Sequence, residues 1–216
     1  MTADSVLRVG LVYPELLGTY GDRGNAVVLV QRARWRGHPA ELVEVPASEP
    51  IPSLLDVYLF GGGEDDPQSM AAAGMRASGA NVRQARANGA VVLAVCAGFQ
   101  LIGHRYDTPE GESIEGLGLI DVVTRPGGGP RFIGEVVVEP EDPSLPRLTG
   151  FENHGGRTTL GAGERPLGRV ITGVGNGDGT DGVRAERLVG TYLHGPVLPR
   201  NPALADLLLS WQLGEL

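Results

Sequence analysis

The chain has 216 residues, a formal net charge of −8 and no lysine, so every basic side chain other than histidine is arginine. The acidic balance argues against a general grip on the phosphate backbone of nucleic acid, and the missing lysine excludes a P-loop and Schiff-base chemistry. The single cysteine excludes internal disulfides and zinc sites built on paired cysteines, which fits a reducing cytoplasm.

In the first half of the chain, β-rich runs alternate with helical stretches. Strands are expected at 6–14, 40–46, 56–62 and 90–96, and helices at 25–37, at 68–88 and directly after residue 96. This alternation predicts an α/β fold with a mostly parallel, doubly wound central sheet and helices on both faces. Ligands of such sheets bind beyond the carboxyl ends of the strands. Three turns rich in glycine fall there: 18–25 (GTYGDRGN), 60–68 (FGGGEDDPQ) and 96–100 (CAGFQ).

The second half has a different pattern. Residues 115–140 predict hairpin strands around a glycine-rich turn. After them come GFENHGGRTTL (150–160), a glycine-rich loop at 173–183, a strand at 187–195 and an amphipathic helix at 202–213. With no repeat and no linker, one domain covering residues 1–216 is predicted. No apolar run is long enough for a transmembrane segment and the first residues lack a signal-peptide layout, so a cytoplasmic location is expected.

Cys96 ends an apolar strand and is followed by Ala97 and Gly98 at the start of a helix. A strand–nucleophile–helix turn of this kind presents its side chain at the sheet edge. The helix N-terminus also favours a thiolate there. A lone cysteine is more often an inert apolar residue, but the C-x-G-x-Q spacing favours a nucleophile. We therefore predict that Cys96 is catalytic.

A cysteine nucleophile needs a base, and the chain has four histidines. His38 belongs to an arginine-rich helix end, and His104 lies far along the helix that follows Cys96. His154, in a glycine-rich loop, stays open as an alternative. His194 follows an apolar strand at the edge where ligands bind, so it is predicted to accept the thiol proton and return one to a leaving amine.

Acyl transfer also needs donors for an oxyanion, and the FGGGE turn offers backbone amides with no side chains in the way. Gly63 and Ala97 are the predicted donors, with Gly62 as an alternative to Gly63. An ordinary βα turn would carry the same glycines, so the motif is weak by itself. In TYGDRGN, Asp22 or Asn25 is expected to cap the following helix, and the cluster as a whole to lie at a pocket or an interface.

These motifs together carry a family resemblance. VLAVCAGFQLIG resembles the nucleophile turn of class I (triad-type) glutamine amidotransferases. GTYLHGP resembles the histidine motif of their cobyric-acid-synthase-like branch. With TYGDRGN, FGGGEDDPQ and GFENHGGRT, the chain from about residue 8 to about residue 212 is similar to the glutaminase subunits of lipid II isoglutaminyl synthase.

The resemblance implies that Cys96 attacks the side-chain amide of L-glutamine, forms a γ-glutamyl thioester and releases ammonia, with His194 as base and acid. It implies that Arg131, in GGGPRFIGE, holds the α-carboxylate of glutamine, a task suited to a bidentate guanidinium. Gln100 and Gly62 are expected to line the same pocket.

The same resemblance implies a partner. No metal or cofactor is expected in this chain; ATP and Mg are expected on a Mur-ligase-like synthetase subunit of a heterodimer. That subunit would bind lipid II and convert D-glutamate of its stem peptide to D-isoglutamine with the ammonia. The alternatives are a cobyric-acid-type amidotransferase for another carboxylate acceptor, a non-catalytic binding subunit, and another cysteine hydrolase or chaperone of the same broad fold.

One departure from the family pattern concerns the group that orients the base. Many class I enzymes carry a glutamate two residues after the histidine, whereas His194 is followed by Gly195 and Pro196. The candidates for the missing carboxylate are Glu152, another local group, or a carboxylate of the partner subunit.

Overall fold

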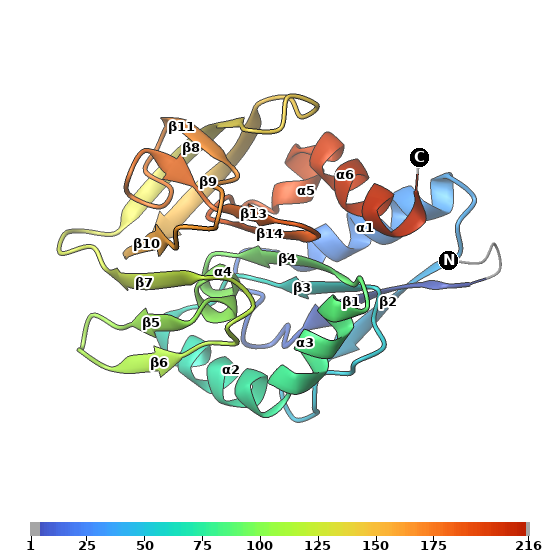
Figure 1. The fold of residues 1–216 in the computed structure, drawn as a ribbon, viewed down its shortest axis with the longest axis horizontal. Coiled ribbons are helices and arrows are strands. Elements are labelled where there is room, and N and C mark those ends of the chain that lie inside the picture. Colours follow the sequence, from blue (N-terminus) through green and yellow to red (C-terminus); the bar gives the residue numbers. More distant parts are fainter. Residues whose placement is uncertain (1–4, 215–216) are drawn as a thin grey trace.

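The computed structural model describes residues 5–214, except for the side chains of residues 65 and 66. At its centre lies a six-stranded sheet with the strand order β13-β14-β4-β3-β1-β2 (Figure 1). All its pairings are parallel except β13–β14. The strands are β1 (Leu7–Val12), β2 (Ala40–Val45), β3 (Val57–Phe60), β4 (Val91–Val95), β13 (Val183–Ala185) and β14 (Leu188–Thr191). The predicted mostly parallel sheet is confirmed.

Helices cover both faces of this sheet, as predicted (Figure 1). One layer consists of α1 (Arg23–Trp35), α5 (Val197–Arg200) and α6 (Pro202–Leu213), and the opposite layer of α2 (Asp65–Ala77), α3 (Gly79–Ala87) and α4 (Ala97–Ile102). Every residue of β3, β4 and β14 is buried, because strands covered on both faces have no solvent side. Within residues 5–214, no helix is both long enough and apolar enough to cross a membrane.

The predicted hairpin at 115–140 is wrong, because its two longer strands belong to different sheets. β7 (Val122–Pro126) pairs with β5 (Arg105–Asp107) and β10 (Gly156–Leu160), and β6 (Ser113–Glu115) completes that sheet. β8 (Phe132–Pro140) pairs instead with β9 (Leu148–His154) and β11 (Gly168–Thr172), with β12 (Thr180–Asp181) at the edge. Alternating apolar residues indicate a strand but not its partner.

The helix predicted at 68–88 is two helices, α2 and α3, separated at Ser78. Ser78 has φ −101° and ψ 4°, outside the regular helix. Its hydroxyl accepts a hydrogen bond from the backbone N–H of Ile51 at 2.9 Å. A Ser–Gly step is a common place for a helix to bend, and the bond from a distant loop holds the bend in place.

The strand register brings three turns to one edge of the central sheet. Phe60 of β3 pairs with Ala94 of β4, and Val95 of β4 pairs with Thr191 of β14. Residues 61–63, Cys96 and the segment 192–194 therefore follow three neighbouring strands at the same end, as expected for ligand sites of parallel sheets.

Candidate active site

Cys96 occupies a strained turn between β4 and α4. Its backbone has φ 50° and ψ −107°, a conformation that costs a residue other than glycine roughly 1–3 kcal/mol. The Cys96 N–H donates to the carbonyl of Thr191 at 2.9 Å, and Gly98 N–H donates to the carbonyl of Gly61 at 3.0 Å. A Cβ at Gly98 would lie 2.5 Å from the Phe60 carbonyl oxygen. Only a very small residue lets α4 start so close to β3, as predicted for a nucleophile turn.

The Cys96 side chain opens into a narrow pocket. The Sγ atom is 3.9 Å from the backbone carbonyl oxygen of Asn153, which accepts the thiol hydrogen. Gly63, Gln100 and Arg131, three of the other predicted site residues, line this pocket with Cys96. Of the remaining predicted residues that the structure describes, Gly62, Ala97 and His194 do not line it.

His194 is fully buried and lies three residues after the end of β14. Its backbone pairs with Phe151 through hydrogen bonds in both directions, of 2.8 and 3.2 Å. The Tyr20 ring lies against its imidazole, with ring centroids 4.4 Å apart. A Cβ at Gly62 would lie 2.6 Å from His194 Cε1, so a side chain at that position would meet the ring. The imidazole is thus enclosed between the loop after β1 and the loop after β3.

The protonation of His194 follows from this enclosure. Burial, together with electrostatic interactions with His154 and Arg131, lowers the pKa of His194 to about 3. The imidazole is therefore neutral at physiological pH, the form that can accept a proton. Neither of its ring nitrogens has a hydrogen-bond partner among the residues that the structure describes.

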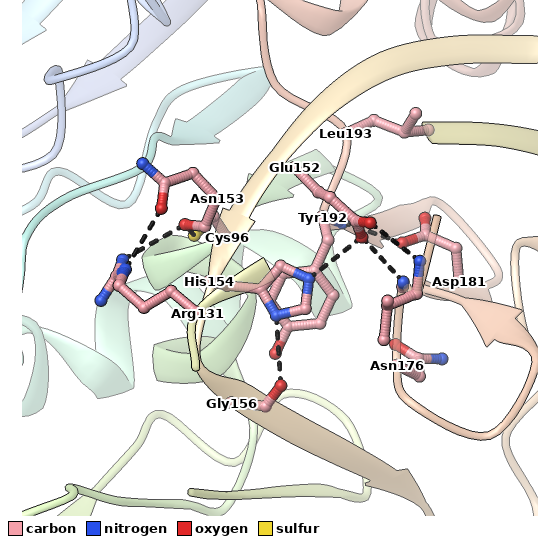
Figure 2. Close-up of polar contacts among 12 residues, drawn as sticks. Cys96, Arg131, Glu152, Asn153, His154, Gly156, Asn176, Asp181, Tyr192 and Leu193 are labelled. Atoms are coloured by element: carbon pink, nitrogen blue, oxygen red, sulfur yellow. Dashed lines mark hydrogen bonds and ion pairs between the residues drawn. The ribbon is translucent and has the colours of Figure 1, made fainter. Parts of the chain in front are cut away.

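Glu152, one of the candidates for orienting His194, is bound to a different histidine. Its carboxylate lies 3.3 Å from His154 Nε2 and accepts the backbone N–H groups of Val174 and Gly175 at 2.8 and 2.9 Å (Figure 2). Burial raises the pKa of Glu152, but the hydrogen bonds from His154 and the two amides outweigh burial and hold it below its usual value. As a candidate for the orienting group of His194, Glu152 is wrong.

His154, the alternative base, is buried, and both of its ring nitrogens interact with oxygen atoms of the protein. Its Nδ1 lies 3.1 Å from the Gly156 carbonyl oxygen and its Nε2 faces Glu152. The ring stacks on Tyr192, with centroids 3.9 Å apart and planes 18° apart. His154 lines the Cys96 pocket, but both ring nitrogens already face oxygen atoms, which makes His194 the better candidate for the base.

Asp181 braces the segment that leads to His194, a role that the sequence pattern did not predict. Its carboxylate accepts the Thr191 hydroxyl at 2.6 Å and the Tyr192 N–H at 3.2 Å. Burial raises the pKa of Asp181 to about 6, although these two hydrogen bonds act to lower it. The signal was weak, since the sequence around Asp181 is rich in glycine (GNGDGTDG), and aspartates in such stretches usually form turns, whereas the structure places Asp181 in β12.

The predicted cap in TYGDRGN is also wrong. The Asp22 side chain caps no helix; it accepts the Gly62 N–H at 2.7 Å and the Asn25 side-chain amide at 3.1 Å. Burial raises the pKa of Asp22 to about 6, although both hydrogen bonds oppose the shift. Asn25 in turn accepts the N–H of Leu198 in α5 at 2.9 Å. These contacts fix the glycine loop after β3.

The backbone amides of Gly62 and Gly63 therefore have different surroundings. The Gly62 N–H is engaged by Asp22, whereas Gly63 lines the pocket beside Cys96. This arrangement favours Gly63 over Gly62 as an oxyanion donor, together with Ala97, which directly follows the nucleophile. Both donor roles stay predictions.

Three pocket residues, Gln100, Gln68 and Arg131, are held by hydrogen bonds within the protein. The Gln100 side-chain oxygen Oε1 accepts a hydrogen bond from the Gln68 side-chain amide at 2.8 Å. The Gln100 side-chain nitrogen Nε2 donates to the Tyr192 hydroxyl at 3.3 Å. Gln68 lines the pocket and was not predicted as a site residue, although it lies in the FGGGEDDPQ motif. Arg131 immediately precedes β8, and its guanidinium is tied to Asn153. In the described part of the chain, no cluster of three His, Cys, Asp or Glu side chains could hold a metal ion.

Comparisons with known proteins agree with this geometry. Residues 8–202 match the CobB/CobQ-like glutamine amidotransferase domain. The chain is 38% identical to the lipid II isoglutaminyl synthase (glutamine-hydrolyzing) subunit GatD of Staphylococcus aureus, over 89% of this chain and 79% of that protein. It is 37% identical to the GatD subunit of Streptococcus pneumoniae, over 96% and 80%. Against the cobyric acid synthase of Pelotomaculum thermopropionicum it is 40% identical, over 61% of this chain but 27% of that protein.

Solved structures show the same fold. A glutamine amidotransferase crystal structure matches with a TM-score of 0.65 and 20% identity, over 94% of this chain and 98% of that one. PurLQS from Thermotoga maritima matches with a TM-score of 0.67 and 15% identity, over 95% and 98%. The chain belongs to the CobB/CobQ-like glutamine amidotransferase family and is a glutamine amidotransferase.

Proposed function

We propose that this chain is the cytoplasmic glutaminase subunit of a two-subunit lipid II isoglutaminyl synthase. It would hydrolyse L-glutamine and deliver ammonia to a Mur-ligase-like subunit that binds ATP and Mg and amidates the D-glutamate of the lipid II stem peptide. The absence of lysine, and hence of a P-loop, supports a division of labour in which the partner uses ATP.

The observation that carries this proposal is the extent of the matches. The chain spans 79% and 80% of the two GatD subunits but only 27% of the Pelotomaculum cobyric acid synthase. A separate glutaminase subunit therefore fits better than the amidotransferase part of a larger corrinoid enzyme.

The chemistry would proceed through a thioester on Cys96. Neutral His194 removes the thiol proton, and the sulfur attacks the side-chain amide carbon of glutamine, whose oxygen takes negative charge. The amides of Gly63 and Ala97 would stabilise that oxyanion. His194 then protonates the departing nitrogen, ammonia leaves, and the γ-glutamyl thioester remains. Water, deprotonated by His194, hydrolyses the thioester to glutamate and restores the thiol.

Arg131 would select the substrate by its α-carboxylate. A guanidinium matches a carboxylate through two parallel hydrogen bonds, and Arg131 lies in the pocket lining with Cys96. Gln100 and Gln68 would form part of the same wall.

The orienting carboxylate for His194 would come from the partner. Glu152 is engaged by His154, and the His194 ring nitrogens have no partner in the described part of the chain. A carboxylate at Nδ1 would raise the pKa of His194 from its depressed value and strengthen it as a base. Glutamine hydrolysis would then rise when the two subunits assemble.

The decisive experiment measures ammonia released from L-glutamine by the full chain, alone and with the synthetase encoded beside it. We expect release that increases in the complex and is lost in Cys96→Ser. Amidation of lipid II by the complex distinguishes the proposed acceptor from a corrinoid carboxylate. The absence of ammonia in both states would refute the glutaminase and favour a non-catalytic binding subunit.

A further inference from the structure

Asn153 connects three elements of the active site. Its side-chain oxygen accepts Arg131 Nε–H at 3.1 Å, and its backbone oxygen accepts a terminal N–H of Arg131 at 3.3 Å. The same backbone oxygen is 3.9 Å from Cys96 Sγ. Its side-chain amide donates to the Tyr20 hydroxyl at 2.9 Å. Figure 2 shows Arg131 and Cys96 on the same side of this residue.

The position of Asn153 is fixed by its neighbours in β9. Glu152 and His154 are 3% and 1% exposed and bind each other on the inner side of the strand. Side chains alternate along a strand, so Asn153 faces the other way, toward Arg131. Asn153 also pairs with Ile133 of β8, two residues beyond Arg131, which brings the amide and the guanidinium together.

The contacts to Arg131 set the orientation of its guanidinium plane. Arginine carries five N–H donors in one rigid plane, and bonds from Nε and a terminal nitrogen to the same residue leave that plane little freedom to rotate. A carboxylate is recognised bidentately only when the plane is correctly turned. The neutral amide of Asn153 provides the orientation without adding a negative charge that would compete with the substrate.

The contact to Tyr20 acts on the general base. The Tyr20 ring lies over His194, with centroids 4.4 Å apart and planes inclined by 46°. Asn153 holds the hydroxyl end of that ring. One amide thus ties the residue that would bind the substrate to the residue that covers the base.

We propose that Asn153 is a positioning residue of the glutaminase site, which orients Arg131 for the α-carboxylate of glutamine and holds Tyr20 over His194. This inference rests on the proposed function, in which Arg131 binds glutamine. Its main consequence falls on substrate binding, because the Asn153 side chain contacts Arg131, which lines the pocket, whereas Asn153 is not among the lining residues.

The test compares two substrates in the Asn153→Ala variant: L-glutamine and its α-methyl ester, which lacks the carboxylate charge. For L-glutamine we expect KM to rise roughly tenfold, the ordinary effect of losing a hydrogen bond to a charged group, while kcat changes by less than about threefold. For the ester, KM should be nearly the same in the variant and the wild type, because Arg131 has no charge to bind.

A second variant and a control complete the design. Asn153→Asp keeps the shape and the acceptor but pairs its charge with Arg131, so the KM for L-glutamine should rise further than in Asn153→Ala. Asn81 lies in α3, outside the pocket, and its side-chain amide donates to the Ile51 carbonyl. Asn81→Ala should leave the KM for both substrates unchanged.

Two outcomes would overturn the inference: an unchanged KM for L-glutamine in both Asn153 variants, or an equal loss for glutamine and its ester. The second outcome would assign Asn153 a purely structural role. Each requires that the wild-type chain release ammonia. A wild type without activity, alone and in the complex, would refute the proposed function and the inference that rests on it.

Discussion

A Gly62→Ala substitution should remove most of the glutaminase activity and leave the fold intact. The added Cβ would lie 2.6 Å from His194 Cε1 and 3.1 Å from Tyr20 Cδ2, where ordinary contacts begin at 3.4 Å. The His194 ring must therefore retreat by about 0.8 Å. It is fully buried, Tyr20 lies against its face, and the same Cβ also meets the Tyr20 ring, so both rings must shift to make room.

The expected magnitude follows from that displacement. A catalytic group misplaced by about 1 Å can lose on the order of 10²-fold in rate, and overpacking of this kind costs about 1–3 kcal/mol of stability. We therefore expect kcat to fall by about 10²-fold and Tm to drop by several degrees, with the same circular dichroism spectrum as the wild type.

The assay is ammonia release from L-glutamine by the chain and its synthetase partner, with Gly134→Ala as the matched control. A Cβ at Gly134 has nothing within 4 Å, so this variant should retain wild-type kcat. A Gly62→Ala enzyme with more than half of the wild-type kcat would refute the reasoning, either because the ring tolerates the methyl group or because His194 is not the base.

Three further predictions test the interior of the site. The pKa of His194 is lowered from its ordinary value of 6.5 to about 3 in the folded chain. As pH falls below about 6.5, the unfolded chain therefore binds a proton at His194 that the folded chain does not bind. Stability from this group is thus lost as pH falls, by about 2 kcal/mol between pH 7 and 5. Asp22 and Asp181, whose pKa values are raised to about 6, contribute the opposite trend in the same pH range. Urea unfolding should therefore show that the wild type loses about 2 kcal/mol of stability relative to His194→Gln between pH 7 and 5; equal slopes would contradict it. Glu152→Gln should lower stability by about 3 kcal/mol, because it leaves His154 without its buried anionic partner; a change below about 1 kcal/mol would show that the pair contributes little. Gly190→Ala should destabilise by more than about 2 kcal/mol, since its Cβ would lie 2.3 Å from the Phe99 ring; an unchanged Tm would show that α4 can shift.

Much of the fold and the centre of the site were predictable from local patterns. Uniformly apolar runs alternating with helices indicate a parallel sheet covered on both faces, and the carboxyl ends of its strands must share an edge. That logic placed Cys96, the glycine turn and His194 at one edge, where the register puts them. It worked because strand order and chain direction constrain these positions without any knowledge of side-chain contacts.

Patterns failed where a group could choose between several partners. The hairpin at 115–140 was predicted from alternation, which does not say that β7 and β8 pair with other strands. A cap was expected of Asp22, but its carboxylate reaches the Gly62 amide 40 residues away. In both cases the group pairs with a partner that is distant in sequence, because the folded chain brings that partner closer than the local one.

The amino-acid sequence by itself determined the chemistry available to this protein: one thiol on a strained turn, a histidine at a strand end, arginine as the sole permanent cation, and no lysine for nucleotide binding. Only the tertiary structure decided how these groups are paired. In the folded chain Glu152 binds His154, Tyr20 and Gly62 enclose His194, and Arg131 donates a hydrogen bond to Asn153. The physical reason is that hydrogen bonds and burial depend on distances across the folded chain, which spacing along the sequence does not encode.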